Sequence, residues 1–155
     1  GDAIPAVTLK HLGANGMEDQ NTGELFKGKK AVLFGVPGAF TPTCSAKHLP
    51  GFLNHAQELR DKGVDLIACM SVNDPFVMAE WAKSQNAGED VVMVADGNGE
   101  LTKAMGLEMD ASGFCLGTRC QRFALVAEDG KVTGLFVEEP GAFEVSSAEH
   151  VLKNL

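Results

Sequence analysis

The residues best placed for chemistry are a cysteine and the prolines and threonines that precede it, in the stretch VPGAFTPTCSAKH, residues 36–48. The apolar run 31–36 predicts a buried strand, and the pattern after Cys44 predicts a helix. Cys44 therefore falls where a helix begins, and free backbone N–H groups there favour a negative charge. Because the thiolate is the nucleophilic form of cysteine, we interpret Cys44 as a reactive residue.

A helix start alone does not make a reactive thiolate. An ordinary thiol, with a pKa of about 8.5, is only a few per cent ionised at neutral pH, and ionising most of it requires about 2.7 kcal/mol. A helix terminus supplies about 0.3–1 kcal/mol, and the net charge of −8 opposes ionisation. We therefore predict a nearby cation, with Arg60, Arg119 and Arg122 as the candidates. Arg60 lies far along the same helix, whereas Arg122 begins a predicted strand and is preferred. The Thr41 hydroxyl is a candidate hydrogen-bond donor to the thiolate.

The prolines around Cys44 shape its access. Pro37 and Pro42 fix the turn and remove backbone donors, which leaves an apolar collar that limits water and large reagents. Pro50 lies inside the helical pattern and should kink or restart that helix. The turn that carries Cys44 could then unwind locally without unfolding the domain.

The remaining pattern predicts an α/β fold. The run Glu128-Asp129-Gly130 between the last two strands is a hairpin signal. A mixed central sheet with helices on both faces is expected, as one domain of residues 1–155. Strands are predicted over 31–36, 64–72, 91–95, 122–127 and 131–137, and helices over 49–59, from 73 through 81, over 100–105 and over 146–155.

Composition argues against several functions. The 13 lysines and arginines form no run, which argues against nucleic acid and anionic membranes as partners. No apolar stretch approaches the roughly 20 residues of a membrane span. Residues 1–5 lack the features of a signal peptide, so a cytoplasmic location is predicted, while an organellar presequence already removed is left open.

No metal or cofactor is predicted. The chain has no C-x-x-C pair, and its four histidines are not at metal-ligand spacing with any cysteine. Residues 97–99 and 113–117 are glycine-rich but lack the context of a phosphate loop. The spacing of the four cysteines does not suggest a disulfide framework, so we expect free thiols in a reducing compartment.

The segment around Cys44 resembles the P-x-x-x-T-x-x-C active-site motif of the peroxiredoxins, in their type II or peroxiredoxin-5-like branch. The similarity extends in order over nearly the whole chain. It includes GVPGAFTPTCS (35–45), KHLPGF (47–52), CMSVNDPFV (69–77), QRFA (121–124) and VEEPGAF (137–143).

The resemblance implies a thioredoxin-like fold and a thiol-dependent peroxidase that reduces hydrogen peroxide and organic hydroperoxides. Cys44 matches the peroxidatic cysteine, which becomes a sulfenic acid, and Thr41 matches the residue that hydrogen-bonds thiolate and peroxide. Arg122 matches the arginine that activates the thiol and polarises the O–O bond, and Pro37 the proline that shields the site. The resemblance also implies a homodimer and antioxidant function. His48 and Trp81 fall in matching segments, but no role is assigned to them.

The resemblance leaves the regeneration of Cys44 open. Some relatives carry a resolving cysteine just before the final helix, but the matching stretch 142–146 has none. This favours attack on the sulfenic acid by glutathione or glutaredoxin, with thioredoxin as a further possibility. Cys69 lies in a predicted strand and is more simply a buried structural thiol, although some relatives have a second cysteine there.

Cys115 and Cys120 are a departure from the family pattern, on a predicted loop. One of them could resolve Cys44, they could pair with each other, or they could have no role. Arg119 would favour the thiolate of Cys120.

Two other functional hypotheses are kept beside the enzyme. Cys44 could serve a peroxide sensor or chaperone-like partner as a switch, or the chain could be a scaffold without redox function. The acidic residues Glu138, Glu139 and Glu144 are predicted to form a solvated rim that could contact a reductant protein.

Overall fold

The computed structural model describes residues 2–155. Its strands are β1 (Thr8–Gly13), β2 (Gly16–Asn21), β3 (Lys30–Gly35), β4 (Leu66–Ser71), β5 (Val92–Ala95), β6 (Glu108–Asp110), β7 (Thr118–Cys120), β8 (Phe123–Glu128) and β9 (Lys131–Val137). Its helices are α1 (Thr22–Phe26), the π-helix η1 (Cys44–His48), α2 (Leu49–Asn54), α3 (Ala56–Asp61), α4 (Pro75–Ser84), α5 (Glu100–Met105), the 3₁₀-helix η2 (Ser112–Phe114) and α6 (Ala148–Lys153).

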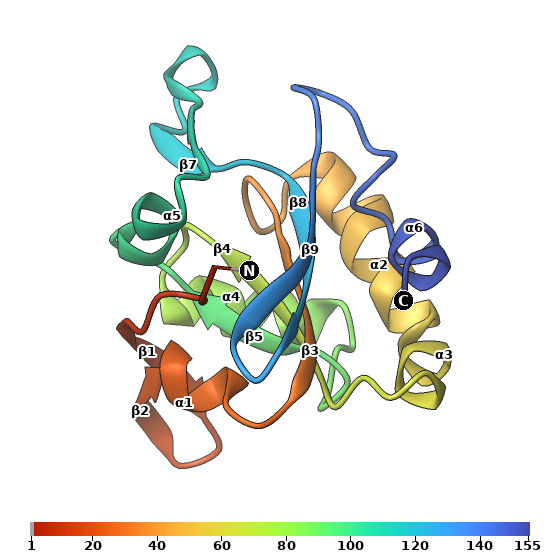
Figure 1. The fold of residues 1–155 in the computed structure, drawn as a ribbon. Coiled ribbons are helices and arrows are strands. Elements are labelled where there is room, and N and C mark those ends of the chain that lie inside the picture. Colours follow the sequence, from red (N-terminus) through yellow and green to blue (C-terminus); the bar gives the residue numbers. More distant parts are fainter. Residues whose placement is uncertain (1) are drawn as a thin grey trace.

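The centre of the fold is a five-stranded mixed sheet in the order β5-β4-β3-β8-β9 (Figure 1). Strands β3, β4 and β5 run parallel, and β8 and β9 are antiparallel to their neighbours. All of β4 and nearly all of β3 are buried, as their continuous apolar sequences predict. The predicted hairpin is confirmed, since Asp129 and Gly130 both have positive φ angles between β8 and β9.

Helices cover both faces of this sheet, as predicted. One buried cluster packs alternate strand side chains against α2, α3, α4 and α6, and it includes Leu49, Phe52, Trp81 and Val151. The other cluster packs the opposite face against β1, α1 and α5. The loop after β3, which leads to Cys44, and the start of β8 both lie at the upper end of the sheet in Figure 1.

The first helix differs from its prediction. The helical pattern was expected to kink or restart at Pro50, and it does restart there, because α2 begins at Leu49. A second break at His55, between α2 and α3, was not predicted. Pro50 sits in the first turn of α2, where a missing N–H costs little. The helical segment before this restart is the π-helix η1, which ends at His48, immediately before α2.

The last helix begins later than predicted. Ser147 is its N-cap and accepts a hydrogen bond from the His150 N–H at 3.1 Å. Ser146 and Glu149 do not form a capping box at this helix start, because both side chains bind elsewhere. Ser146 donates to Glu138, and Glu149 contacts His55.

Two small hairpins were not predicted. The β1–β2 hairpin and the β6–β7 hairpin are each separate two-stranded sheets, and apart from Leu9 and Cys120 their side chains are exposed or half-buried. Their residues therefore lack the apolar run or strict alternation that marks a core strand. The β6–β7 hairpin matters for function, because it forms one wall of the site.

Candidate active site

The loop that carries Cys44 into the site is fixed at both ends. Gly35 ends β3 against the Phe123 ring, and a Cβ there would lie 2.1 Å from a ring atom, so only glycine fits. Further along, the Ala39 N–H donates to Asn73 Oδ1 at 3.0 Å, and the Ser71 hydroxyl donates to the same oxygen at 2.6 Å. These bonds tie the loop to the end of β4.

Cys44 begins the π-helix η1 and is fully buried. The wide turn closes with the Leu49 N–H donating to the Cys44 carbonyl, five residues back. Within this turn the Ser45 hydroxyl accepts a hydrogen bond from the buried Trp81 indole at 3.0 Å. Single π-helical turns are frequent at functional sites. This one places Cys44 and His48 so that the same arginine contacts both.

Arg122 is that arginine. Its Nη2 donates to Cys44 Sγ at 3.2 Å, and its Nη1 donates to His48 Nδ1 at 2.9 Å. The residue immediately precedes β8, so the sheet delivers a guanidinium to the thiol from a distant part of the chain. Of the other two candidates, Arg60 pairs with Asp90 at 3.0 Å, and Arg119 donates to the Pro37 carbonyl at 3.3 Å.

His48 is buried and acts as a neutral acceptor for Arg122. Its Nε2–H donates to the Ser146 carbonyl at 2.9 Å, which leaves Nδ1 free to accept from the guanidinium. Burial, and then the charge of Arg122, lower the pKa of His48 to about 3 despite the opposing Ser146 contact. No role was predicted for His48, although its position four residues after Cys44, where a helix was predicted, was a usable signal.

Glu138 holds the segment whose backbone carbonyl binds His48. The prediction of a solvated rim is wrong for this residue, which is buried and accepts hydrogen bonds from Glu144 N, Ser146 N and Ser146 Oγ at 2.7–2.8 Å. Burial by itself would raise the pKa of Glu138, but these bonds outweigh it and hold the pKa below its usual value. The carboxylate therefore folds residues 144–146 back toward the site and presents the Ser146 carbonyl to His48.

Thr41 and Pro37 lie at the mouth of the site, both half-buried. The Thr41 hydroxyl donates to the Gly38 carbonyl at 2.6 Å rather than to the Cys44 thiol. Its oxygen lone pairs remain able to accept a hydrogen bond. Pro37 is held through its carbonyl by Arg119.

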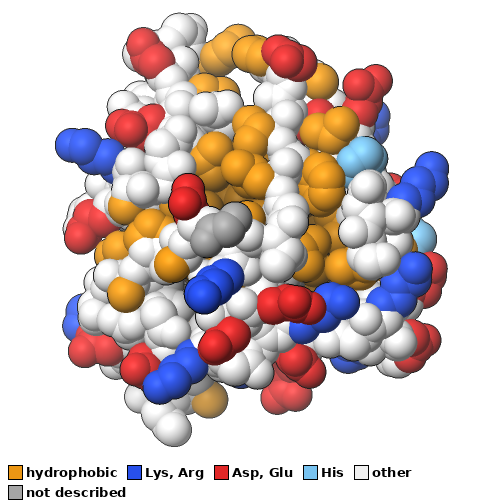
Figure 2. Space-filling view, viewed as in Figure 1, with side chains coloured by type: hydrophobic (Ala, Val, Ile, Leu, Met, Phe, Trp, Pro, Cys, Tyr) orange, Lys and Arg blue, Asp and Glu red, His pale blue; other side chains and the backbone are white. Residues whose placement is uncertain are grey.

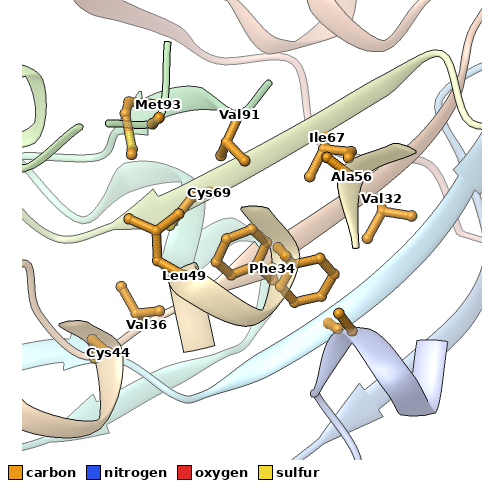
Figure 3. Close-up of a cluster of buried hydrophobic side chains, with 14 of the residues drawn as sticks. Val32, Phe34, Val36, Cys44, Leu49, Ala56, Ile67, Cys69, Val91 and Met93 are labelled. Atoms are coloured by element: carbon orange, nitrogen blue, oxygen red, sulfur yellow. The ribbon is translucent and has the colours of Figure 1, made fainter. Parts of the chain in front are cut away.

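The remaining cysteines differ sharply in environment, although all four are free. Cys69 lies inside the core cluster of Figure 3 with Leu49 and Met93, and burial raises the pKa of its thiol well above the usual value. Cys120 is also buried, and burial raises its pKa to about 12. The expectation of a loop thiol activated by Arg119 is therefore wrong for Cys120. Cys115 is exposed, and in this structure neither it nor Cys120 forms a disulfide.

A groove of about 640 Å³ opens beside this constellation. Arg122, Pro37 and Thr43 form its inner end, the β6–β7 hairpin forms one wall and residues 138–142 form the other. In Figure 1 these two walls are the segments that rise on either side of the β8 start. Residues 2–155 hold no group of three His, Cys, Asp or Glu side chains suited to a metal ion. No helix in that part of the chain is long and apolar enough to cross a membrane.

Comparison with known proteins places this constellation in a family. Residues 1–152 match the Redoxin family model. Peroxiredoxin-2B of Arabidopsis thaliana is 51% identical over 156 residues, covering 100% of this chain and 96% of the relative. The chain belongs to the peroxiredoxins.

Further relatives and solved structures similar to this peroxiredoxin belong to the same family. Chloroplastic peroxiredoxin-2E-2 of Oryza sativa subsp. japonica is 55% identical, covering 100% of this chain and 71% of the relative. A crystal structure of reduced Prx3 from Vibrio vulnificus in complex with H₂O₂ superposes with a TM-score of 0.95 at 54% identity, covering 99% and 96% of the two chains. A 1-Cys peroxiredoxin of Plasmodium falciparum gives a TM-score of 0.90 at 31% identity, covering 99% and 98%.

This peroxiredoxin is accordingly a thiol peroxidase with an antioxidant function, on a thioredoxin-like fold. The enzyme hypothesis drawn from the sequence is confirmed. The match to the peroxiredoxins also favours the enzyme hypothesis over the peroxide-sensor and scaffold hypotheses.

Proposed function

We propose that Cys44 is the peroxidatic nucleophile and that Arg122 activates it. The observation that carries this assignment is the 3.2 Å hydrogen bond from Arg122 Nη2 to Cys44 Sγ. A guanidinium stays protonated at any physiological pH and stabilises a neighbouring thiolate. Hydrogen bonds to charged groups contribute about 1.5–3 kcal/mol. That is the size of the stabilisation that a helix start could not supply alone.

The chemical step follows from this arrangement. The Cys44 sulfur donates an electron pair to the terminal peroxide oxygen, so an S–O bond forms and the O–O bond breaks. Sulfur is oxidised by two electrons to a sulfenic acid, and the other oxygen leaves as hydroxide or alkoxide and takes a proton to become water or an alcohol. Arg122 can stabilise the charge that develops on the leaving oxygen.

Thr41 and Pro37 orient and shield the peroxide. Because the Thr41 proton is used by Gly38, its hydroxyl oxygen accepts the hydrogen bond of the peroxide O–H and aims the terminal oxygen at sulfur. Pro37 offers no backbone donor at the mouth, and its ring closes the site to bulk water.

Regeneration uses a thiol from outside the chain. Cys69 and Cys120 are buried with raised pKa values, so both are poor nucleophiles. Ser146 stands in the stretch where some relatives carry a resolving cysteine. Glutathione with glutaredoxin, or thioredoxin, would attack the sulfenic acid to form a mixed disulfide and water, and a second thiol would release Cys44. Since Cys44 is fully buried, the η1 turn must open for this step.

The functional unit in this proposal is a homodimer of one-domain chains, residues 1–155. Phe40 and Phe76 are 54% and 62% exposed. The Ala39–Asn73 hydrogen bond ties the loop of Phe40 to the segment just before α4, whose first turn carries Phe76, so we place both rings at one corner beside the active site. A second copy of the chain would cover this apolar corner.

The cellular location stays a prediction. The sequence favours the cytoplasm, but two of the relatives are described as chloroplastic, so an organelle fits the same fold. Fractionation of the source cells with an antibody against the chain would decide between them.

Rapid-mixing kinetics with hydrogen peroxide would test the assignment. Cys44→Ser should abolish the reaction, and Arg122→Lys should slow it on the order of 10²-fold, because an ammonium cannot contact Cys44 and His48 together. Cys115→Ser is the matched control and should react like the wild type. A Cys44→Ser variant that keeps the wild-type rate would refute the proposal. Recycling with glutathione plus glutaredoxin, or with thioredoxin, then identifies the reductant.

A further inference from the structure

The groove beside Arg122 is larger than hydrogen peroxide requires. Its volume of about 640 Å³ lies within the range of pockets that hold organic ligands. A molecule whose peroxide group reaches Cys44 past Arg122 would leave its other end in this groove. The lining of the groove therefore bears on which hydroperoxides react well.

One wall of the groove is apolar. Met109, Phe114 and Leu116 line it, and the Phe114 side chain is 84% exposed, the largest value among the exposed large hydrophobic residues. All three belong to the β6–β7 hairpin or its connecting loop. In Figure 2, hydrophobic side chains lie next to acidic ones at this upper end of the molecule. This wall suits a hydrocarbon group.

The rim of the groove is acidic. Its exposed carboxylates are Glu108, Asp110 and Glu139, the buried Glu138 also lines the groove, and no lysine does. The one cation in the lining, Arg122, is already engaged by Cys44 and His48. Hydrogen bonds from Ser112 hold the pKa of Asp110 below its usual value, so this carboxylate is charged at neutral pH. A reactant with a carboxylate or phosphate would meet net repulsion here.

We propose that this groove selects neutral organic hydroperoxides, with the organic group on Met109, Phe114 and Leu116, and that its acidic rim turns away anionic hydroperoxides. The inference rests on the proposed role of Cys44, since it concerns the same reaction. The redox step is unchanged: sulfur takes the terminal oxygen, and the organic part leaves as a neutral alcohol. The acidic rim discriminates between hydroperoxides by their charge. Hydrogen peroxide is neutral, so the rim charge does not act on it.

The test compares cumene hydroperoxide bearing a para-carboxylate with its methyl ester. Each rate is divided by the rate of the same protein with hydrogen peroxide. For the wild type at low ionic strength we expect the ester to react on the order of 10-fold faster than the acid. The ratio should fall toward one as salt rises to about 0.5 M, because exposed charges are screened.

Two sets of variants assign that ratio to the rim. Neutralising three exposed rim residues together, Glu108→Gln, Asp110→Asn and Glu139→Gln, should bring the ratio near one, and Glu138 is left intact because it supports the fold. The control neutralises Glu18, Asp61 and Glu89, which lie outside the groove lining, and should keep the wild-type ratio. Phe114→Ser should lower the relative rate of the ester by about 3-fold to 10-fold.

Several results would overturn the proposal. One is an equal relative rate for acid and ester in the wild type at low salt, and another is a ratio that the rim variant leaves unchanged. If the rim variant alters only the rate at which glutathione or a protein thiol resolves the sulfenic acid, the groove serves the reductant and the proposal is wrong. A wild-type protein that does not react with hydrogen peroxide at all would instead refute the role of Cys44.

Discussion

Cys44 and Arg122 meet although 78 residues separate them. The guanidinium makes two contacts in a fixed fork, one to sulfur and one to the His48 ring, so its position does not depend on the thiol alone. This matters for the proposed reaction, in which the Cys44 thiol is oxidised and reduced in each cycle. In that proposal, the contact with the neutral His48 imidazole is what holds Arg122 in place while the thiol changes state.

The direction of the Thr41 hydroxyl leads to a prediction at the residue scale. Its proton is directed at the Gly38 carbonyl, so in the proposed reaction the hydroxyl oxygen is the group that accepts a hydrogen bond from the peroxide. Thr41→Val removes this acceptor at nearly constant volume and should slow the reaction with hydrogen peroxide on the order of 10²-fold. Thr41→Ser, which keeps the hydroxyl, should retain most of the rate. Equal losses in both variants would show that the methyl group, not the oxygen, is what matters.

His48 should remain neutral throughout the working pH range. Its pKa of about 3 in the folded protein lies below the ordinary value of 6.5. As pH falls below 6.5, His48 therefore binds a proton in the unfolded chain but not in the folded chain. The free energy of unfolding therefore decreases progressively down to about pH 3, by an amount on the order of 4–5 kcal/mol from this residue.

Two measurements check the state of His48. Nitrogen NMR should show the Nε2–H tautomer without titration between about pH 5 and pH 8, because imidazole titration would otherwise fall there. In urea unfolding, the stability difference between wild type and His48→Gln should shrink as pH falls from about 6.5 toward 3. A ring that titrates near 6.5 would contradict the account.

At the scale of elements, the loop between β9 and α6 acts as a support for the site. Glu138 gathers the backbone N–H groups of Glu144 and Ser146, and the Ser146 carbonyl then fixes the tautomer of His48. Glu138 touches neither sulfur nor peroxide, so it is a positioning residue. It acts through Ser146, His48 and Arg122 in turn.

Glu138→Gln tests this positioning role. The variant weakens three hydrogen bonds, so we expect the pH midpoint of thiolate formation to move to higher pH and the peroxide rate to fall by about 3-fold to 10-fold. Glu139→Gln is the matched control, because it removes the same charge from the next residue, which is exposed. Losing a negative charge alone should favour the thiolate and move the midpoint to lower pH. Midpoint shifts of the same sign in both variants would contradict the relay.

Much of the sheet was predictable from the sequence, because β3, β4, β8 and β9 carry apolar runs and a hairpin signal. The site was predictable only in part. The predicted helix start and the surrounding prolines indicated Cys44 as the reactive residue. The need for a cation limited its possible partners to three arginines. The roles of His48, Glu138 and Arg119 depend on contacts between segments far apart in the sequence. Glu138 was wrongly expected to be solvated because its three hydrogen-bond partners follow it in a loop without periodic pattern.

At the scale of the whole molecule, the two buried clusters on opposite faces of one sheet leave an apolar corner uncovered at Phe40 and Phe76. If this corner is the dimer surface, Phe76→Ser should shift sedimentation from dimer to monomer at micromolar concentration, since burying an aromatic side chain contributes about 1.5–3 kcal/mol on each side. Phe114→Ser, at an exposed phenylalanine of the groove, is the control. A wild-type chain that sediments as a monomer would refute the dimer.

The central claim is that Cys44 alone takes the oxygen and waits for a thiol from outside. Its most direct test is the intact mass of the reduced protein after one equivalent of hydrogen peroxide without reductant, followed by peptide mapping. The account predicts a protein heavier by one oxygen, located at Cys44. A protein lighter by two hydrogens, with Cys44 linked to Cys69, Cys115 or Cys120, would contradict the external thiol, and an unmodified Cys44 would contradict the site itself.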